Sequence, residues 1–321
     1  MKRIIALLIV FALALSFAAC TGSGNNNTTD STTTEGTQQT TTTTTAGTTT
    51  SATTTITTTT TTKETTTTTP VVVTTTDSGK VEMPEGVKSV IDVTFADGKM
   101  TDACGTMSFE LRNGAKIEKT TVKHNGKEYS IDALNITAAG QAAIGTLGDS
   151  QTIASAQKFY NRDFSFEAFY VSGNRTETIA AMCATENISN KRGGAGIADA
   201  KGNPYFCIGL GGSYASCYAN KTTTAGELVH VIGVYDKTAK QLRIYVNGQL
   251  CNSMDLSSEI LVIQNNGLAN QLGFGADVSM KANYDFPASA YTLVRANMYD
   301  GAVTDEQATA IYKYAVASLA K

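Results

Sequence analysis

The hydrophobic pattern of the chain changes twice along its length. Residues 4–15 form an unbroken apolar run, residues 21–79 carry almost no large apolar side chain, and residues 80–321 contain many short alternating segments. Apolar and polar residues that alternate with a period of two are typical of β-strands with one buried face. We therefore expect three regions: a terminal segment at 1–20, a segment without a core at 21–79, and one globular domain at 80–321.

The globular region is predicted to be an antiparallel β-sandwich. Its alternating segments are rich in β-branched and aromatic residues, and Gly, Asn and Asp separate them, as expected for strands joined by turns. Asn247-Gly248 is the strongest hairpin signal, and Gly211-Gly212 indicates a second hairpin. The clearest strands are predicted at 90–95, 164–171, 178–183, 204–210, 214–218, 228–235, 241–246, 271–275 and 288–299.

A helical pattern begins only after Gly301. Thr304 is a good helix cap, and Gln307 three residues later completes a capping box. Small and apolar side chains then recur at helical spacing, at Ala308, Ile311, Tyr312 and Ala315. The all-β domain is therefore expected to end in one short C-terminal helix.

Threonine dominates residues 21–79, where Ile56 is isolated from other large apolar residues until the valines at 71–73. Such a segment cannot bury enough apolar area to offset the entropy of ordering its backbone, so we predict a disordered linker. Threonine-rich tracts are often O-glycosylated stalks, and an unmodified flexible tether is the alternative. In either form the segment is a spacer.

The first twenty residues have the three parts of an export signal. Lys2 and Arg3 precede an apolar run at 4–15 that is shorter than the ~20 residues of a membrane-spanning helix. The following residues, FAAC at 17–20, resemble the lipobox of bacterial lipoproteins, in which the cysteine is acylated. This resemblance implies lipidation of Cys20 and a lipid anchor on the extracellular face of a bacterial membrane. A plain secretory peptide is the alternative.

The charge balance argues against nucleic acid as a partner. Removing Lys2 and Arg3 with the signal lowers the basic count from 25 to 23, against 28 acidic residues, so the net charge changes from −3 to −5. A mildly acidic chain without a basic stripe does not match a phosphate backbone or an anionic lipid surface. Contact with the membrane is therefore expected through the N-terminal lipid anchor alone.

Five cysteines remain after Cys20, so they cannot all pair within the chain, and their spacing matches no zinc site. Cys207 and Cys217 lie on the two arms of a predicted hairpin, where a disulfide is one interpretation. Buried free thiols that act as small apolar residues are the other interpretation, and we favour it.

Four segments of the domain carry a resemblance to a known family. The segment DFSFEAF at 163–169 looks like the D-F-T-I/L-E-A/F-W/F strand of concanavalin A-like, laminin-G-like jelly rolls, and ELVHVIGVYD at 227–236 is similar to W-H-H-V-A-V-T-Y-D. LRIYVNG at 242–248 resembles L-R-L-Y-V-N-G, and RANMYDGAVTDEQ at 295–307 resembles the ending V-R-I-Y-N-R-A-L-T-x-E-E-I. The matches follow the family's order over most of 80–321 and imply a two-sheet antiparallel jelly roll.

The resemblance also implies candidate ligand sites. Such jelly rolls often hold calcium at a rim, and calcium prefers oxygen ligands, so Asp and Asn side chains near turns are candidates. Ordinary turn roles are the alternative for each of them. The chain has no Trp, so tyrosines are the candidate platform for a sugar. The calcium candidates are Asp97, Asp102, Asp277, Asn283 and Asp285, and the tyrosines are Tyr205, Tyr214, Tyr218 and Tyr284.

No catalytic motif stands out in the sequence. The paired carboxylates of this superfamily's glucanases, E-x-D-x-E or E-x-D-x-x-E, do not occur, and neither does a G-x-S-x-G or H-E-x-x-H motif. His230 is expected to be structural because the family also has His in this strand, and His124 is expected to be exposed beside the Asn125-Gly126 turn. We therefore predict that the chain is not an enzyme.

Three functions remain for a domain of this class. The favoured one is a surface-displayed, non-catalytic module that binds carbohydrate or another extracellular or cell-wall polymer. A glycoside hydrolase or lyase with carboxylates on separate strands is the second, because the fold alone does not decide function. The third is a structural or assembly role in the cell envelope.

Overall fold

The computed structural model describes residues 81–138, 140–147, 160–173, 176–182, 193–260, 271–275 and 291–320. All of them belong to the second of two units, Thr66–Lys321. The predicted signal segment and linker lie outside these residues. Within the described ranges, no helix is long and apolar enough to cross a bilayer.

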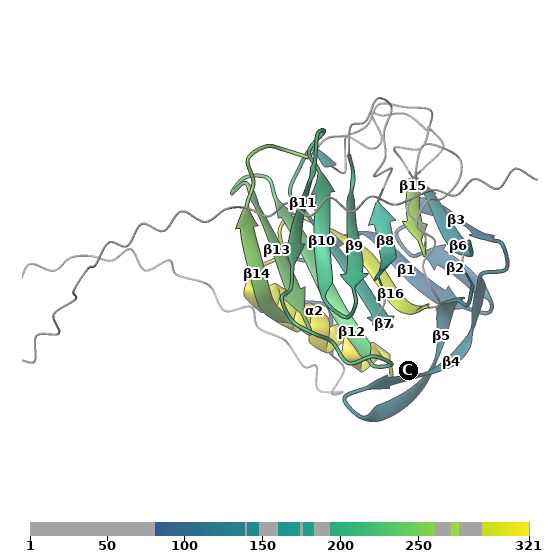
Figure 1. Cartoon of the computed structure of the whole chain (residues 1–321). Helices are drawn as coiled ribbons and strands as arrows, with labels where there is room; N and C mark the ends of the chain where they lie inside the picture. Colours follow the sequence, from purple (N-terminus) through teal and green to yellow (C-terminus); the bar gives the residue numbers. More distant parts are fainter. Residues whose placement is uncertain are drawn as a thin grey trace, which may run out of the picture. The chain divides into compact units, whose positions relative to one another are not determined.

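One antiparallel sheet has nine strands, and its main path has the order β14-β13-β12-β7-β16-β1-β2 (Figure 1). A hairpin of two further strands branches from it, since β5 pairs with both β16 and β4. In chain order these strands are β1 (Lys88–Ala96), β2 (Lys99–Asp102), β4 (Lys116–His124), β5 (Lys127–Ile136), β7 (Phe164–Val171), β12 (Leu228–Asp236), β13 (Gln241–Val246), β14 (Gln249–Asp255) and β16 (Tyr291–Asp300).

The second antiparallel sheet has seven strands in the order β11-β10-β9-β8-β15-β6-β3 and faces the first (Figure 1). In chain order these strands are β3 (Met107–Arg112), β6 (Ala142–Leu147), β8 (Thr176–Met182), β9 (Ala195–Ala200), β10 (Pro204–Gly209), β11 (Tyr214–Tyr218) and β15 (Gln271–Phe274). Side chains from both sheets form one apolar cluster between them. The prediction of a two-sheet antiparallel sandwich is confirmed.

Strand β7 shows how the sequence makes the two layers. Its alternate residues Phe164, Phe166 and Tyr170 point into the apolar cluster between the sheets, as the alternation predicts. The intervening residues Ser165 and Glu167 are fully buried as well. Both faces of the nine-stranded sheet are therefore covered at β7, which is typical of a central strand between two layers.

The second cover is the C-terminal helix α2 (Asp305–Ser318), which lies along the outer face of the nine-stranded sheet (Figure 1). Thr304 accepts a hydrogen bond from the backbone N–H of Gln307, and the Gln307 side chain accepts one from Thr304, so the predicted capping box is present. Ala308 and Ile311 pack against residues of β12, β13 and β16. The predicted helix is confirmed, and its apolar side closes a second core.

The turns follow from residues that tolerate positive φ. Asn247 and Gly248 have φ values of 51° and 75°, which suit the tight hairpin between β13 and β14. Gly248 also lies close to α2, because an added Cβ would be only 3.0 Å from Cβ of Tyr312. The predicted Asn247-Gly248 hairpin is confirmed, and its glycine is required both by φ and by the close approach of the helix.

We expect Gly233→Ala to destabilise the domain strongly. Gly233 lies in β12 opposite the facing sheet, and an added Cβ would lie 2.2 Å from Cγ of Phe206, so the core would be overpacked. Overpacking costs roughly 1–3 kcal/mol or more, measured as the free energy of unfolding in urea. Gly212→Ala is the matched control, because nothing lies within 4 Å of its added Cβ. Equal stability of the two variants would contradict the packing of β12 against β10.

Candidate functional site

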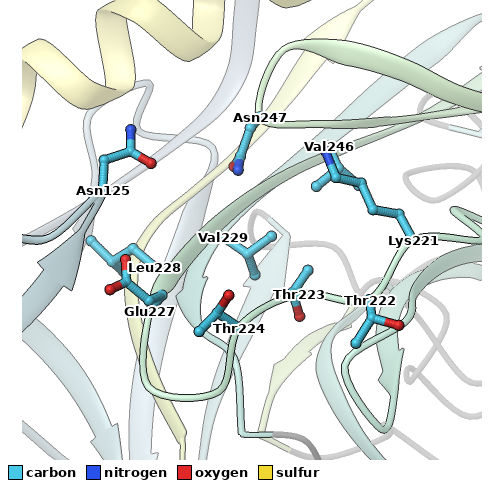
Figure 2. Close-up of a pocket in the computed structure, with 10 residues that line it drawn as sticks. All are labelled: Asn125, Lys221, Thr222, Thr223, Thr224, Glu227, Leu228, Val229, Val246 and Asn247. Carbon is cyan, nitrogen blue, oxygen red and sulfur yellow. The ribbon is translucent and has the colours of Figure 1, made fainter.

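A polar pocket opens at one rim of the sandwich, beside the loop that connects β11 to β12. Its volume is about 140 Å³. Figure 2 shows Asn125 and Glu227 on one side of the pocket and Lys221 and Thr222 on the other, with Val229 between them. The lining residues are Asn125, Lys221, Thr222, Thr223, Thr224, Glu227, Leu228, Val229, Val246 and Asn247.

The loop beside this pocket is anchored by a buried carboxylate, Asp199. Its oxygens accept hydrogen bonds from the Tyr170 hydroxyl and from the backbone N–H of Gly202. The Gly202 carbonyl in turn accepts bonds from the backbone N–H of Thr223 at 2.7 Å and from its hydroxyl at 3.0 Å. Burial raises the pKa of Asp199, although these hydrogen bonds act in the opposite direction. The pocket wall is therefore tied to the sandwich through two strands.

The charged groups of the pocket are available to a ligand. In the part of the chain that the structure describes, neither Lys221 nor Glu227 forms an ion pair with another side chain. Below them, Val229 and Val246 are buried at the rim of the apolar core. The arrangement offers a cation, a carboxylate, hydroxyls and amides around an apolar base.

A second pocket of about 490 Å³ lies on the other side of the same loop. It shares Thr224 and Glu227 with the first pocket, and its remaining walls come from the β4–β5 hairpin, β7 and β16. The lining residues are Thr121, Val122, Lys123, Val171, Thr224, Ala225, Gly226, Glu227 and Thr292.

The structure places two of the candidate sugar-binding tyrosines side by side. Tyr205 and Tyr218 are directly opposite on β10 and β11, with ring centroids 4.7 Å apart and planes 30° from parallel. Tyr218 is 38% exposed, and Tyr214 is half-buried opposite Gly209. All three residues lie on β10 and β11, within the strands predicted at 204–210 and 214–218. Tyr284 lies outside the described residues.

The structure does not bring Asp97 and Asp102 together as a calcium site. Asp97 occupies the turn before the four-residue strand β2, and Asp102 ends that strand. Both carboxylate oxygens of Asp102 are engaged, because Asp102 accepts hydrogen bonds from the backbone N–H groups of Asp92, Cys104, Thr106 and Met107 at 2.7–3.0 Å. Asp102 therefore organises a turn. The candidates Asp277, Asn283 and Asp285 lie outside the described ranges, within which no cluster of three His, Cys, Asp or Glu could hold a metal.

The cysteine pair does not form the disulfide considered above. In the β10–β11 register Cys207 lies opposite Ser216, and Cys217 lies opposite Phe206, so the two cysteines point to opposite faces of the sheet. Cys217 is a free, buried thiol whose pKa is raised to about 11 by burial. Its role as a small apolar core residue matches the favoured interpretation.

The two histidines are both buried under α2. His230 donates from Nε2 to Glu167, at 2.8 Å, and its ring packs on Phe169. His124 donates from Nδ1 to the carbonyl of Leu228 and accepts at Nε2 from the Tyr312 hydroxyl. His124 is only 2% exposed, so the prediction of an exposed His124 is wrong. The reason is that α2 folds back over the β4–β5 turn.

Glu167 is the centre of a buried polar cluster between the nine-stranded sheet and α2. Arg295 donates to both carboxylate oxygens at 3.1 Å, Asn297 donates at 2.7 Å, and the Tyr299 hydroxyl also donates. Burial alone would raise the pKa of Glu167, but Arg295 and the hydrogen bonds from His230 and Tyr299 lower it to about 2. Glu167 is therefore a fully paired structural carboxylate.

A second carboxylate shares this face of the sheet. Asp92 lies opposite Asn297 in the register, and Asn297 lies opposite Glu167 on the other side. Burial raises the pKa of Asp92. Glu167 has no exposed surface under α2, so these two acids do not flank an open groove. Among the residues that the structure describes, Glu227 is the only acidic side chain that lines the two rim pockets.

The rim pocket was missed by sequence reasoning. Residues 219–227 read as an ordinary polar loop between two strands, and the contribution of Asn125 comes from a hairpin a hundred positions away. The only local signal is the run KTTTAGE at 221–227, which gathers hydroxyls and two opposite charges in one short connection.

Comparison with known proteins agrees with this architecture. Residues 145–308, just over half of the chain, match the family model described as the concanavalin A-like lectin/glucanases superfamily. The chain therefore belongs to the concanavalin A-like lectin/glucanase superfamily. No curated protein matches the sequence.

Solved structures of the same fold are distant in sequence. One is a structure of botulinum neurotoxin type C, whose cell entry is described as dependent upon interaction with two ganglioside molecules. It has a TM-score of 0.50 and 12% identity, over 73% of this chain and 52% of that chain. A mutant of HCR/D has a TM-score of 0.51 and 13% identity, over 71% of this chain and 52% of that chain. A receptor binding domain has a TM-score of 0.50 and 12% identity, over 73% of this chain and 51% of that chain. This chain spans about half the length of these structures, and the similarity shows the fold alone.

Removing the charge of Glu167 should destabilise the domain. We expect Glu167→Gln to cost roughly 3–5 kcal/mol at neutral pH, because it leaves the Arg295 charge buried without its partner. Urea unfolding measures this cost. Glu110→Gln is the control, because Glu110 pairs with Arg112 at the surface, where an ion pair contributes less than about 1 kcal/mol.

The same carboxylate should make stability depend on pH. The pKa of Glu167 is lower in the folded chain than its usual 4.5, so its contribution is complete above pH 4.5 and is lost as the pH falls toward about 2. A shift of this size corresponds to roughly 3 kcal/mol. If Glu167→Gln loses stability in that interval as steeply as the wild type, Glu167 does not carry the effect.

Proposed function

We propose that this chain is a non-catalytic module that binds carbohydrate at the rim pocket and is displayed on a bacterial cell surface by a lipid on Cys20. The observation that carries the proposal is that Lys221 and Glu227 both line one pocket whose base is closed by buried valines. Among the described residues, neither side chain forms an ion pair. Its partner is a glycan or another extracellular or cell-wall polymer.

The chemistry of the pocket suits a sugar ring. A pyranose has an apolar C–H face and a ring of hydroxyls that both donate and accept hydrogen bonds. Lys221 can donate to these hydroxyls and Glu227 can accept from them, while the buried valines Val229 and Val246 close the base of the pocket. Small-molecule sites commonly combine an apolar lining with a few well-placed polar groups.

A binding role is favoured over hydrolysis by the number of carboxylates. Glycoside hydrolases usually need two acids on either side of the scissile bond, one as acid and one as base or nucleophile. Glu227 lines both rim pockets without a second acid among the described lining residues, and Glu167 is enclosed under α2. These observations support a module that holds a glycan without cleaving it.

The comparison with solved structures gives further support at the level of the fold. One structure of this fold is titled for its interaction with two ganglioside molecules, which are lipids with sugar headgroups. The identity is 12%, so no residue of that site transfers to this chain. The likeness supports the proposal that this architecture can present a glycan site.

The surface location rests on the N-terminal sequence. Cys20 follows an apolar run and two alanines, which is the order of a lipoprotein signal, and residues 21–79 supply a long threonine-rich spacer. Lipid chains contribute ~0.8 kcal/mol per buried methylene, so two or more chains would anchor the protein firmly. The spacer would then hold the binding domain away from the membrane.

A glycan array probed with the purified chain tests the binding proposal. We expect binding to a defined set of glycans, reduced at least tenfold by Lys221→Ala and by Glu227→Gln, because each removes a charged partner for sugar hydroxyls. Lys119→Ala is the control, since Lys119 is an exposed lysine of β4 that lines neither pocket. Absence of binding, or binding unaffected by the two pocket variants, would disprove the site.

Lipidation is tested by labelling cells with an alkyne fatty acid. We expect the label on the wild-type chain and its loss in Cys20→Ser, with release of the variant from the membrane fraction. Cys104→Ser is the control, because it removes an exposed thiol of the domain and leaves the signal intact. Label that persists in Cys20→Ser would contradict the proposed anchor.

A further inference from the structure

The two charged side chains of the first rim pocket are held apart by the loop that carries both. Lys221 and Glu227 lie on opposite sides of this pocket (Figure 2), and among the described residues they form no ion pair with each other. The loop is anchored twice to the buried Ser172. The Thr223 hydroxyl hydrogen-bonds to the Ser172 hydroxyl at 2.7 Å, and the Glu227 carbonyl accepts from the Ser172 N–H at 3.0 Å. The pocket therefore has two separate charges of opposite sign.

The side of the pocket at Glu227 presents hydrogen-bond acceptors. Asn125 lies on the same side (Figure 2). Its amide nitrogen donates to Nε2 of His124 at 3.2 Å, because Nδ1 of His124 faces the carbonyl of Leu228 at 3.1 Å and carries the ring proton there. This contact fixes the orientation of the Asn125 amide and leaves its oxygen for a ligand. A carboxylate and an amide oxygen together can accept from an ammonium group.

The remaining polar groups include two donors, Lys221 and Asn247. Asn247 lies between the two sides of the pocket in Figure 2, and its side-chain oxygen accepts from the backbone N–H of His230 at 3.0 Å. A backbone N–H can only donate, so this contact fixes the Asn247 amide and leaves its NH₂ group for a ligand. An ammonium and an amide NH₂ together can donate to a carboxylate.

The formal charge of the pocket favours a ligand without net charge. Lys221 and Glu227 are the charged side chains among its described lining residues, and their charges cancel. Lys123, which lines the second pocket, forms an ion pair with Glu128 at 3.4 Å. A complementary ligand carries one positive and one negative group at separate positions, because each then has an oppositely charged partner.

We propose that the first rim pocket selects a zwitterionic sugar unit, which carries an ammonium group and a carboxylate on one ring. This inference rests on the proposed carbohydrate-binding function and specifies the substituents of the bound sugar. The ammonium group binds Glu227 and the Asn125 oxygen, and the carboxylate binds Lys221 and the Asn247 NH₂ group. A sugar with only one charged group leaves one side of the pocket without its partner.

A matched series of glucose derivatives tests this proposal by calorimetry on the purified full chain. Muramic acid carries both charged groups, N-acetylmuramic acid carries the carboxylate alone, glucosamine carries the ammonium group alone, and N-acetylglucosamine carries neither. We expect muramic acid to bind at least tenfold more tightly than the other three. This preference should decrease as salt is added, because interactions of exposed charges are screened.

Charge reversal tests each side of the pocket separately. Glu227→Lys should shift the preference to N-acetylmuramic acid, and Lys221→Glu should shift it to glucosamine, because each variant places two like charges around the ligand. Lys119→Ala is the control, since Lys119 is an exposed lysine outside both pockets, and it should leave the order of affinities unchanged.

The contrary outcomes distinguish the two proposals. Equal affinity for the four sugars, or a preference that neither charge reversal changes, would overturn the zwitterionic ligand and leave carbohydrate binding in place. Array binding confined to glycans that lack one of the two charged groups would do the same. Alanine that binds as tightly as muramic acid would overturn the carbohydrate function, because the sugar ring would contribute nothing. Absence of binding in the series, together with a blank glycan array, would overturn both proposals.

Discussion

The packing of α2 on the nine-stranded sheet depends on one buried charge, the carboxylate of Glu167. Burying an ion without compensation is very costly, so its four donors, Arg295, Asn297, Tyr299 and His230, must all be held in place. They come from the two strands on either side of β7, and α2 seals them from water. The outer face of the nine-stranded sheet thus combines a polar centre with apolar surroundings.

The polar centre extends to the rim pocket through the histidines. His230 donates its backbone N–H to the Asn247 side chain, and its carbonyl accepts from the Asn247 backbone. His124 binds the carbonyl of Leu228, next to the pocket loop, and precedes Asn125. Three walls of the pocket are therefore neighbours of the same buried cluster. Helix α2, the two histidines and the pocket wall are therefore linked to Glu167 by one series of contacts.

Much of the fold, and little of the site, could be predicted from the sequence. Strand β7 begins with clear alternation, β12 is a nearly continuous run of apolar and β-branched residues, and the Asn247-Gly248 turn has a local chemical cause. By contrast, β9, with the sequence AGIADA, has no such signal, because alanine and glycine are poor strand formers and its neighbours determine its conformation. The pocket likewise depends on long-range contacts, and exposure of His124 could not be judged without knowing where α2 would lie.

The anchoring of the loop through Asp199 and Gly202 has a consequence for recognition. A loop whose backbone is already hydrogen-bonded to the sandwich loses little conformational entropy when a partner arrives. Such a surface selects its ligand by shape, because its backbone does not adapt to different ligands. Related molecules that carry one additional protruding group would therefore be excluded by steric clash. A rigid rim of this kind would suit the proposed binding of one glycan in preference to others.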